Sequence, residues 1–348
     1  MVKLFGRRAP RPEPERRTLI LDHCYDDLAL DAALDGLREG DLRAARTVLA
    51  ESREDAETRG LRLDQLSKGL VGHADEIAEL ARQQDEPELW LMAGATYLDE
   101  AMAIRGTGWA EGVGQERFKM VHQIGAKAIG PLHRAAELMP DDSTPWVNLM
   151  SAALVLSAPR DQRDEVWREA VRRSPAHFSA HMIRLQTLAP KWGGTEQEML
   201  TFALETARAA PPGDPLTAIQ PAACFEVYLM ASRQLDDDRL DEFEKLYFSS
   251  ERMQATLMAA SDRWLAEEKP HPRGLQAHHY FAAAFACGGN AERAFLHLLG
   301  TRDRFYQRPW AYLDGSDPEG VYHRMVGRYW PSNLHLQSPM DLSPVFPA

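Results

Sequence analysis

The stretch Pro-Glu-Leu-Trp-Leu-Met-Ala-Gly-Ala-Thr-Tyr, residues 87–97, decides the fold of this chain. It predicts a helix, because Leu, Met and Ala favour helices and proline is tolerated in the first turn. Trp90 and Tyr97 are two turns apart and therefore lie on one face of that helix. The small pair Ala93 and Gly94 between them would let a second helix pack closely. The stretch therefore predicts one half of a tightly packed helix hairpin.

Outward from this stretch, almost everything from residue 26 to residue 330 has a helical pattern. Runs of β-branched residues with strict alternation are missing, whereas Ala, Leu, Glu and Arg dominate. Gly40 is expected to take the left-handed conformation that ends a helix, and Asp41 to cap the next one. Asp85 is expected to be the N-cap of the helix that carries Trp90. The sequence therefore predicts an all-α protein.

Proline residues mark the ends of successive units. Pro140, Pro175 and Pro211 each follow a helical stretch, and they are 35 and 36 residues apart. A new helix is expected after each of the first two. These steps are close to the period of about 34 residues that helix-hairpin repeats use.

The spacing Trp90, Ala93, Gly94, Tyr97 follows the pattern W-x2-[LA]-G-x2-Y and resembles the first helix of a tetratricopeptide repeat. The resemblance covers residues 28–310 and is clearest for residues 86–212. It implies a tetratricopeptide-like stack of antiparallel helix hairpins, an α-solenoid, in which Trp90 is a buried repeat residue. It also implies a concave face that binds segments of other proteins.

The chain also resembles a bacterial helical-repeat family with two characteristic loops and no assigned activity. The first loop is Arg-Gly-x-Gly, here Arg105-Gly106-Thr107-Gly108, and the second is Pro-Lys-Trp-Gly-Gly, here residues 190–194. The first loop falls in an insertion, at about residues 105–125, that lengthens the unit by about 22 residues beyond the repeat period. Such an insertion is expected to form a loop or a partly helical excursion on one face.

Three regions are expected along the chain. Residues 1–25 are basic and proline-rich and predict a flexible arm. Residues 26–330 are expected to form the helical-repeat domain. Residues 331–348 contain four prolines and predict an extended tail.

Composition narrows the function classes. The chain has 348 residues and a net charge of −12, which disfavours general binding to nucleic-acid phosphates. Its three cysteines, Cys24, Cys224 and Cys287, form no close pair in sequence, which suits a reducing cytoplasm. No stretch approaches the roughly 20 apolar residues that span a bilayer. A cytoplasmic protein without a cofactor is expected.

Two loops are candidate binding sites for a partner or a ligand. In the insertion, Arg105 and Trp109 stand among glycines, a composition that suits a recognition surface and equally a plain surface loop. In the turn at residues 190–194, Lys191 and two glycine amides before a helix could hold an anion. Alternatively this is a tight inter-helix turn in which Trp192 fills an apolar gap. Thr195 and Glu198 form a capping-box pattern directly after it.

The pair His177 and His181 has the i, i+4 spacing of two metal ligands on one helix face. A third ligand cannot be identified and H-E-x-x-H is absent, so we expect no metal site. None of the nucleophile or phosphate-loop signatures is present, and we assign no catalytic residue.

Two functions remain open. The first is a non-enzymatic scaffold or adaptor that binds a protein or peptide segment on the concave face of the stack. The second is an enzyme or a small-ligand sensor, with a pocket between the insertion at residues 105–114 and the turn at residues 190–194. A deep pocket with clustered carboxylates or histidines would favour the second.

Overall fold

The computed structural model describes residues 18–21, 23–106 and 114–330. Within these residues the regular structure consists of helices, with one isolated β-bridge and no strand. The prediction of an all-α protein is therefore confirmed. In chain order the α-helices are α1 Leu28–Arg38, α2 Leu42–Glu51, α3 Ala56–Gly69, α4 Ala74–Gln84, α5 Pro87–Arg105, α6 Gln115–Lys127, α7 Ile129–Leu138, α8 Thr144–Val155, α9 Arg160–Arg173, α10 Phe178–Leu188, α11 Glu196–Ala209, α12 Ile219–Ser232, α13 Asp237–Ser249, α14 Glu251–Leu265, α15 Gly274–Cys287, α16 Ala291–Gly300, α17 Trp310–Leu313 and α18 Pro318–Tyr329.

Local sequence sets most of the helix boundaries. Gly40 has a φ of 83°, and the Asp41 side chain accepts a hydrogen bond from the amide of Arg43, so both predictions for this turn are confirmed. Asp85 was expected to cap α5, and this is wrong. It ends α4 in the left-handed conformation, with a φ of 51°, and Glu86 occupies the N-cap of α5. The carboxylate of Asp85 instead accepts a hydrogen bond from the indole of Trp90, at 2.8 Å.

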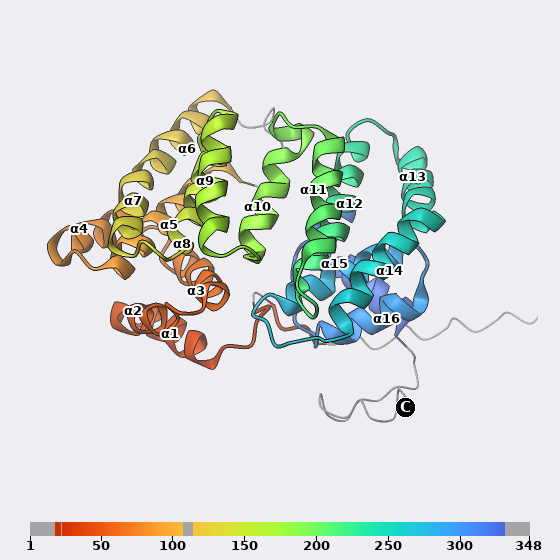
Figure 1. The fold of residues 1–348 in the computed structure, drawn as a ribbon, viewed down its shortest axis with the longest axis horizontal. Coiled ribbons are helices and arrows are strands. Elements are labelled where there is room, and N and C mark those ends of the chain that lie inside the picture. The colour runs from red at the N-terminus through yellow and green to blue at the C-terminus, as the bar shows by residue number, and fades with distance from the viewer. Residues whose placement is uncertain (1–17, 22, 107–113, 331–348) are drawn as a thin grey trace, which may run out of the picture.

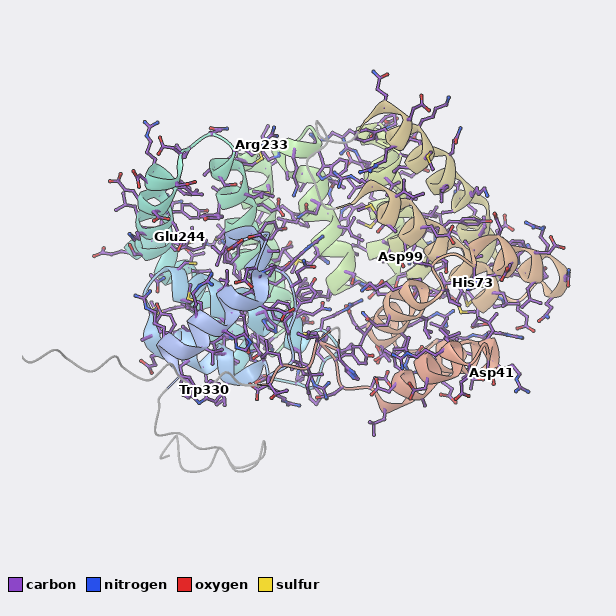
Figure 2. The ribbon with its side chains drawn as sticks, turned by 180° about the vertical axis from the view of Figure 1, so that it is seen from behind. Asp41, His73, Asp99, Arg233, Glu244 and Trp330 are labelled. Carbon is purple, nitrogen blue, oxygen red and sulfur yellow. The ribbon has the colours of Figure 1, made fainter. Side chains whose placement is uncertain are left out.

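The helices α3, α5, α8, α10, α12 and α15 contact one another in that order through the molecule. The helices that flank them in sequence pack against members of this row, as α9 does against α8, α11 against α10 and α16 against α15. In Figure 1, α9, α10, α11 and α12 stand side by side with similar axes. Seen from behind, Asp41 and His73 lie at one end of the molecule, and Arg233 and Glu244 lie at the other (Figure 2).

The apolar core has two large parts. One extends from Tyr25 to Ala152 and fills the space among α1–α5, α7 and α8. The other extends from Phe178 to Val326 and includes the fully buried Trp264 and Trp310. A smaller cluster around Met150 lies between them, among α8, α9 and α10. Packing is therefore continued through the middle of the molecule by those three helices.

The stretch that decides the fold behaves as expected at its centre and differently at its start. An added Cβ at Gly94 would lie 2.5 Å from the Leu132 side chain, so only glycine permits the observed approach of α7 to α5. Tyr97 is 5% exposed. Trp90 was expected to be buried and is only partly buried, because its indole donates a hydrogen bond to the solvent-facing carboxylate of Asp85.

The segment before α1 is bound to the C-terminal half of the molecule. The amide of Ile20 donates to the carbonyl of Asp303, and the amide of Phe305 donates to the carbonyl of Ile20, each at 2.9 Å. Cys24 and Tyr25 are buried. Of the arm expected at residues 1–25, the structure describes residues 18–21 and 23–25, and Leu19, Ile20 and Tyr25 among them contact the helical body.

The insertion expected at residues 105–125 begins at the end of α5 and contains most of α6. The helix α5 continues to Arg105, and α6 begins at Gln115. Residues 107–113 lie outside the described residues, as does the tail at residues 331–348. None of the helices in the part of the chain described is both long and apolar enough to cross a membrane.

Candidate functional site

The backbone geometry of the turn between α10 and α11 explains why residues 190–194 have an unusual sequence. Residues Pro190–Trp192 form a single 3-10 turn, after which Gly193 takes a φ of 84°. A Cβ on Gly194 would lie 2.0 Å from the carbonyl oxygen of Leu188, so this position has room only for hydrogen. The first glycine is required by its backbone conformation and the second by a close backbone approach.

The amides of this turn are already used within the turn itself. The Gly193 amide donates to the Pro190 carbonyl at 3.0 Å, and the Gly194 amide donates to the Ala189 carbonyl at 3.2 Å. The predicted capping box is present, since the Thr195 hydroxyl and the Glu198 carboxylate each accept from the other's backbone amide. The structure therefore does not support an anion site at these glycines.

Lys191 extends from the turn to a buried carboxylate on α12. Its Nζ lies 2.6 Å from Oε2 of Glu226, whose side chain is 2% exposed. The other carboxylate oxygen accepts hydrogen bonds from Nε2 of Gln186 at 2.7 Å and from the hydroxyl of Tyr312 at 2.6 Å. Burial raises the pKa of Glu226, but the ion pair and these hydrogen bonds outweigh burial and lower it below the ordinary value.

Glu226 forms part of the wall of a cavity of about 90 Å³ at the junction of α10, α12, α15 and α17. Its apolar lining comes from Met182, Ile183, Leu185 and Ala222. Its polar lining comes from Gln186, Glu226, Tyr280, Arg308 and Tyr312. The cavity thus combines apolar walls with a small number of polar groups, the composition of most binding sites.

Arg308 differs from the other polar residues of this cavity. It is exposed to solvent, and it makes no hydrogen bond or ion pair with any residue that the structure describes. Guanidinium groups remain protonated at any physiological pH. The cavity therefore presents a full positive charge, together with five N–H donors, to whatever enters it.

The tyrosines around Arg308 are neutral hydrogen-bonding groups. Burial is the main cause that raises the pKa of Tyr280 and of Tyr312 well above the ordinary value, so both keep their hydroxyl protons. Tyr312 donates its proton to Glu226. The pKa shifts of Glu226, Tyr280 and Tyr312 all move away from neutral pH. Proton transfer at physiological pH would require a group whose pKa lies near that pH.

A larger and more open groove lies between α4, α5 and α7, with a volume of about 560 Å³. Trp90 and Tyr97 line it, together with charged groups. Those charges are largely neutralised locally, since Lys127 pairs with Asp75 at 2.8 Å and Arg134 pairs with Asp85. The Tyr97 hydroxyl also donates to Asp75. The groove therefore offers less unsatisfied charge than the cavity at Arg308.

Trp192 and Arg105, which the sequence also singled out, do not line the cavity. Trp192 is half-buried, and its carbonyl accepts a hydrogen bond from Arg163 at 2.9 Å. Arg105, at the end of α5, donates to the carbonyl of Gly106 and does not line either space. Trp109 lies outside the described residues. Of the three predicted binding residues that the structure describes, Lys191 pairs with a residue that lines the cavity, and Arg105 and Trp192 do not line it.

The histidine pair has structural contacts. The imidazole of His177 caps α10 by accepting from the amide of Ala180, and burial lowers the pKa of His177 to about 4. His181 packs between Trp167 and Phe202. Among the described residues, no group of three or more His, Cys, Asp or Glu side chains is placed to hold a metal ion.

Sequence reasoning missed Glu226 and Arg308. Glu226 carried a usable signal, because it is the one charged residue of the otherwise apolar or uncharged helix Ile219–Ser232. A lone carboxylate in such a helix must be buried with partners or face a site. Arg308 carried no comparable signal.

A comparison with protein-family models, curated proteins and solved structures finds no match to this chain.

Proposed function

We propose that this protein is a non-enzymatic scaffold that binds a segment of another protein on the face formed by α10, α12 and α15. In this proposal the helices form a tetratricopeptide-like α-solenoid, and the cavity beside Arg308 receives one side chain of the bound segment. The alternative is an enzyme or a small-ligand sensor.

The order of helix contacts supports the solenoid part of the proposal. Helices α8 and α10 start 34 residues apart, at Thr144 and Phe178, which is the tetratricopeptide period. Each is followed by a helix that packs against it, and the first helices of successive pairs contact each other. The pattern is less regular elsewhere. The helices α6 and α7 both pack against α5, and in the sequence two helices, α13 and α14, separate α12 from α15.

The observation that carries the binding part is the small cavity with an unpaired guanidinium at its edge. Sites for whole metabolites and drug-sized ligands have volumes of roughly 300–1,000 Å³. A cavity of about 90 Å³ is far smaller, and it suits a single side chain better than a separate ligand. Helical-repeat stacks bind extended segments through such individual pockets along one face.

The chemistry of the buried groups favours binding over catalysis. Glu226 is ionised and already has an ion pair and two hydrogen bonds, so it has little capacity to take up a substrate proton. His177 and His181 are used for helix capping and aromatic packing. The proposal therefore assigns Glu226 to positioning the cavity wall and gives the two histidines no part in catalysis.

Affinity purification from source cells tests the proposal. The baits are the wild-type chain, Ile183→Glu at the cavity wall, and Leu246→Glu on α13. Leu246 is 65% exposed and does not line the cavity, so it is a matched control for the added charge. We expect one protein to be retained by the wild type and by Leu246→Glu and to be lost with Ile183→Glu, with all three baits melting at similar temperatures.

Equal retention by all three baits would place the binding surface elsewhere. A metabolite that co-purifies with the wild type in native mass spectrometry, with no protein partner, would favour the ligand-sensor alternative.

A further inference from the structure

We propose that the cavity beside Arg308 selects a carboxylate side chain, Asp or Glu, of the bound protein segment. This inference rests on the proposed function and names the chemistry that the partner must present. It is carried by the charge, the donors and the size of the cavity.

The local charge is the first argument. Lys191 pairs with Glu226 at 2.6 Å, and Glu226 also attracts Arg308 without a direct contact, so that one carboxylate is shared by two cations and one positive charge is left over. Two other arginines near this face do not line the cavity: Arg184 pairs with Asp164, and Arg163 donates to the Trp192 carbonyl. The cavity therefore attracts one negative charge.

The donor geometry is the second argument. A guanidinium presents parallel N–H groups that match the two oxygens of a carboxylate, and such paired bonds are stronger than neutral hydrogen bonds. Gln186 and Tyr312 already donate to Glu226, and Tyr280 interacts with Tyr306, so Arg308 is the charged donor left for the ligand. The charge and the direction of the interaction thus come from one residue.

The apolar walls are the third argument. Met182 and Ile183 on α10 face the same cavity as Arg308, and Ala222 on α12 lines it too. The methylene groups of a glutamate or aspartate side chain would contact these walls while the carboxylate reaches the guanidinium. A cavity of about 90 Å³ has room for this part of a residue and for little more.

The number of unpaired cations decides between a carboxylate and a phosphorylated side chain. A phosphoryl group carries roughly −1.5 to −2 charges at neutral pH, and sites that recognise it use clusters of arginines. Around this cavity, Lys191 and Arg308 face the single carboxylate of Glu226, so one positive charge is in excess. A single negative charge is the better match.

Nuclear magnetic resonance with a minimal probe tests this inference on the full chain. The probes are N-acetyl-glutamate α-amide, its neutral glutamine analogue, and N-acetyl-phosphoserine α-amide, each titrated at millimolar concentration. The Arg308 Nε–Hε signal is identified by its absence from the spectrum of Arg308→Gln. We expect saturable shifts of this signal with the glutamate probe and at least tenfold weaker binding of the glutamine analogue.

The variants separate charge from shape. Arg308→Gln, followed through the side-chain methyl signals of Met182 and Ile183, is expected to weaken the glutamate probe at least tenfold. Arg308→Lys is expected to weaken it less, because a lysine keeps the charge and loses the paired donors. Arg38→Gln is the matched control, since Arg38 is 73% exposed on α1 and does not line the cavity, and its binding is expected to equal that of the wild type.

Glutamate binding that survives in Arg308→Gln would overturn the inference, as would equal binding of the glutamine analogue or tighter binding of the phosphoserine probe. The two proposals fail separately. A partner retained by Arg308→Gln as tightly as by the wild type contradicts the carboxylate selection and leaves the scaffold intact. A partner retained by Ile183→Glu as tightly as by the wild type contradicts the proposed binding face.

Discussion

Arg59 is a fully buried charge at the junction of three elements. Its side chain is 0% exposed, its Nε donates to Asp142 at 2.7 Å, and its Nη2 lies 3.4 Å from Glu88 on α5. Both carboxylates are nearly inaccessible to solvent. Buried charges persist only where they are paired, so these three residues hold α3, α5 and the turn before α8 in one arrangement.

Replacing Arg59 by methionine is expected to lower the free energy of unfolding by roughly 3–5 kcal/mol, because Asp142 and in part Glu88 are left as buried charges without a partner. Urea denaturation measures the change. Arg38→Met is the control, since Arg38 is 73% exposed in an ion pair and should cost less than about 1 kcal/mol. Similar losses in the two variants would contradict the importance of the buried network.

Asp99 on α5, labelled in Figure 2, is a carboxylate whose ionised form is disfavoured. Burial raises the pKa of Asp99 to about 6. In the unfolded chain the group ionises near pH 4, so between these values the folded state binds a proton that the unfolded state has lost. The stability gained from this protonation is present below about pH 4 and is lost as the pH rises through 6.

Asp99→Asn removes this ionisation and is therefore expected to stabilise the protein at high pH only. The gain in unfolding free energy should be about 3 kcal/mol at pH 7.5 and should vanish near pH 4. Thermal melts of the variant and the wild type across that range measure it. A gain that does not change with pH would contradict the burial of an ionisable carboxylate.

At the scale of elements, the turn after α10 is sensitive to substitution. Gly194→Ala is expected to destabilise the protein by roughly 1–3 kcal/mol, since its Cβ would lie 2.0 Å from a backbone oxygen that cannot move alone. Gly130→Ala on α7 is the control, because an added Cβ there meets nothing within 4 Å. Urea denaturation compares the two, and equal stability would contradict the close approach.

Element boundaries were predictable where one residue has one local role. Gly40 with Asp41, and Thr195 with Glu198, were identified correctly because their side chains act within a few residues of the chain. Asp85 was misassigned because α4 ends at Gln84 and α5 begins at Pro87. In so short a connection the same polar residue suits the end of one helix and the start of the next, and packing decides between them.

The site was less predictable than the helices, for a reason of distance along the chain. Lys191 was identified because its turn has an unusual local sequence. Its partner Glu226 and the cavity residue Arg308 come from other elements, and only tertiary packing brings them to one place. The free charge of Arg308 is a property of its surroundings, which one sequence does not display.

At the scale of the whole molecule, the segment before α1 links the two ends of the described chain. Ile20→Pro removes the amide that donates to Asp303 and should lower the melting temperature and speed hydrogen exchange at Phe305. Ile20→Ala keeps the backbone donor and is expected to have a smaller effect. Unchanged exchange at Phe305 in the proline variant would show that this link does not hold in solution.

Photo-crosslinking from the proposed binding face tests the central claim most directly. A benzoylphenylalanine is placed at Met182, on the cavity wall, and in a second variant at Leu246, which is exposed on α13. Crosslinked products from source cells are mapped by mass spectrometry. The scaffold proposal predicts that position 182, and not position 246, is joined to one contiguous segment of a partner protein that contains an acidic residue. Crosslinks that are equal at the two positions, or that join position 182 to no protein, would contradict it.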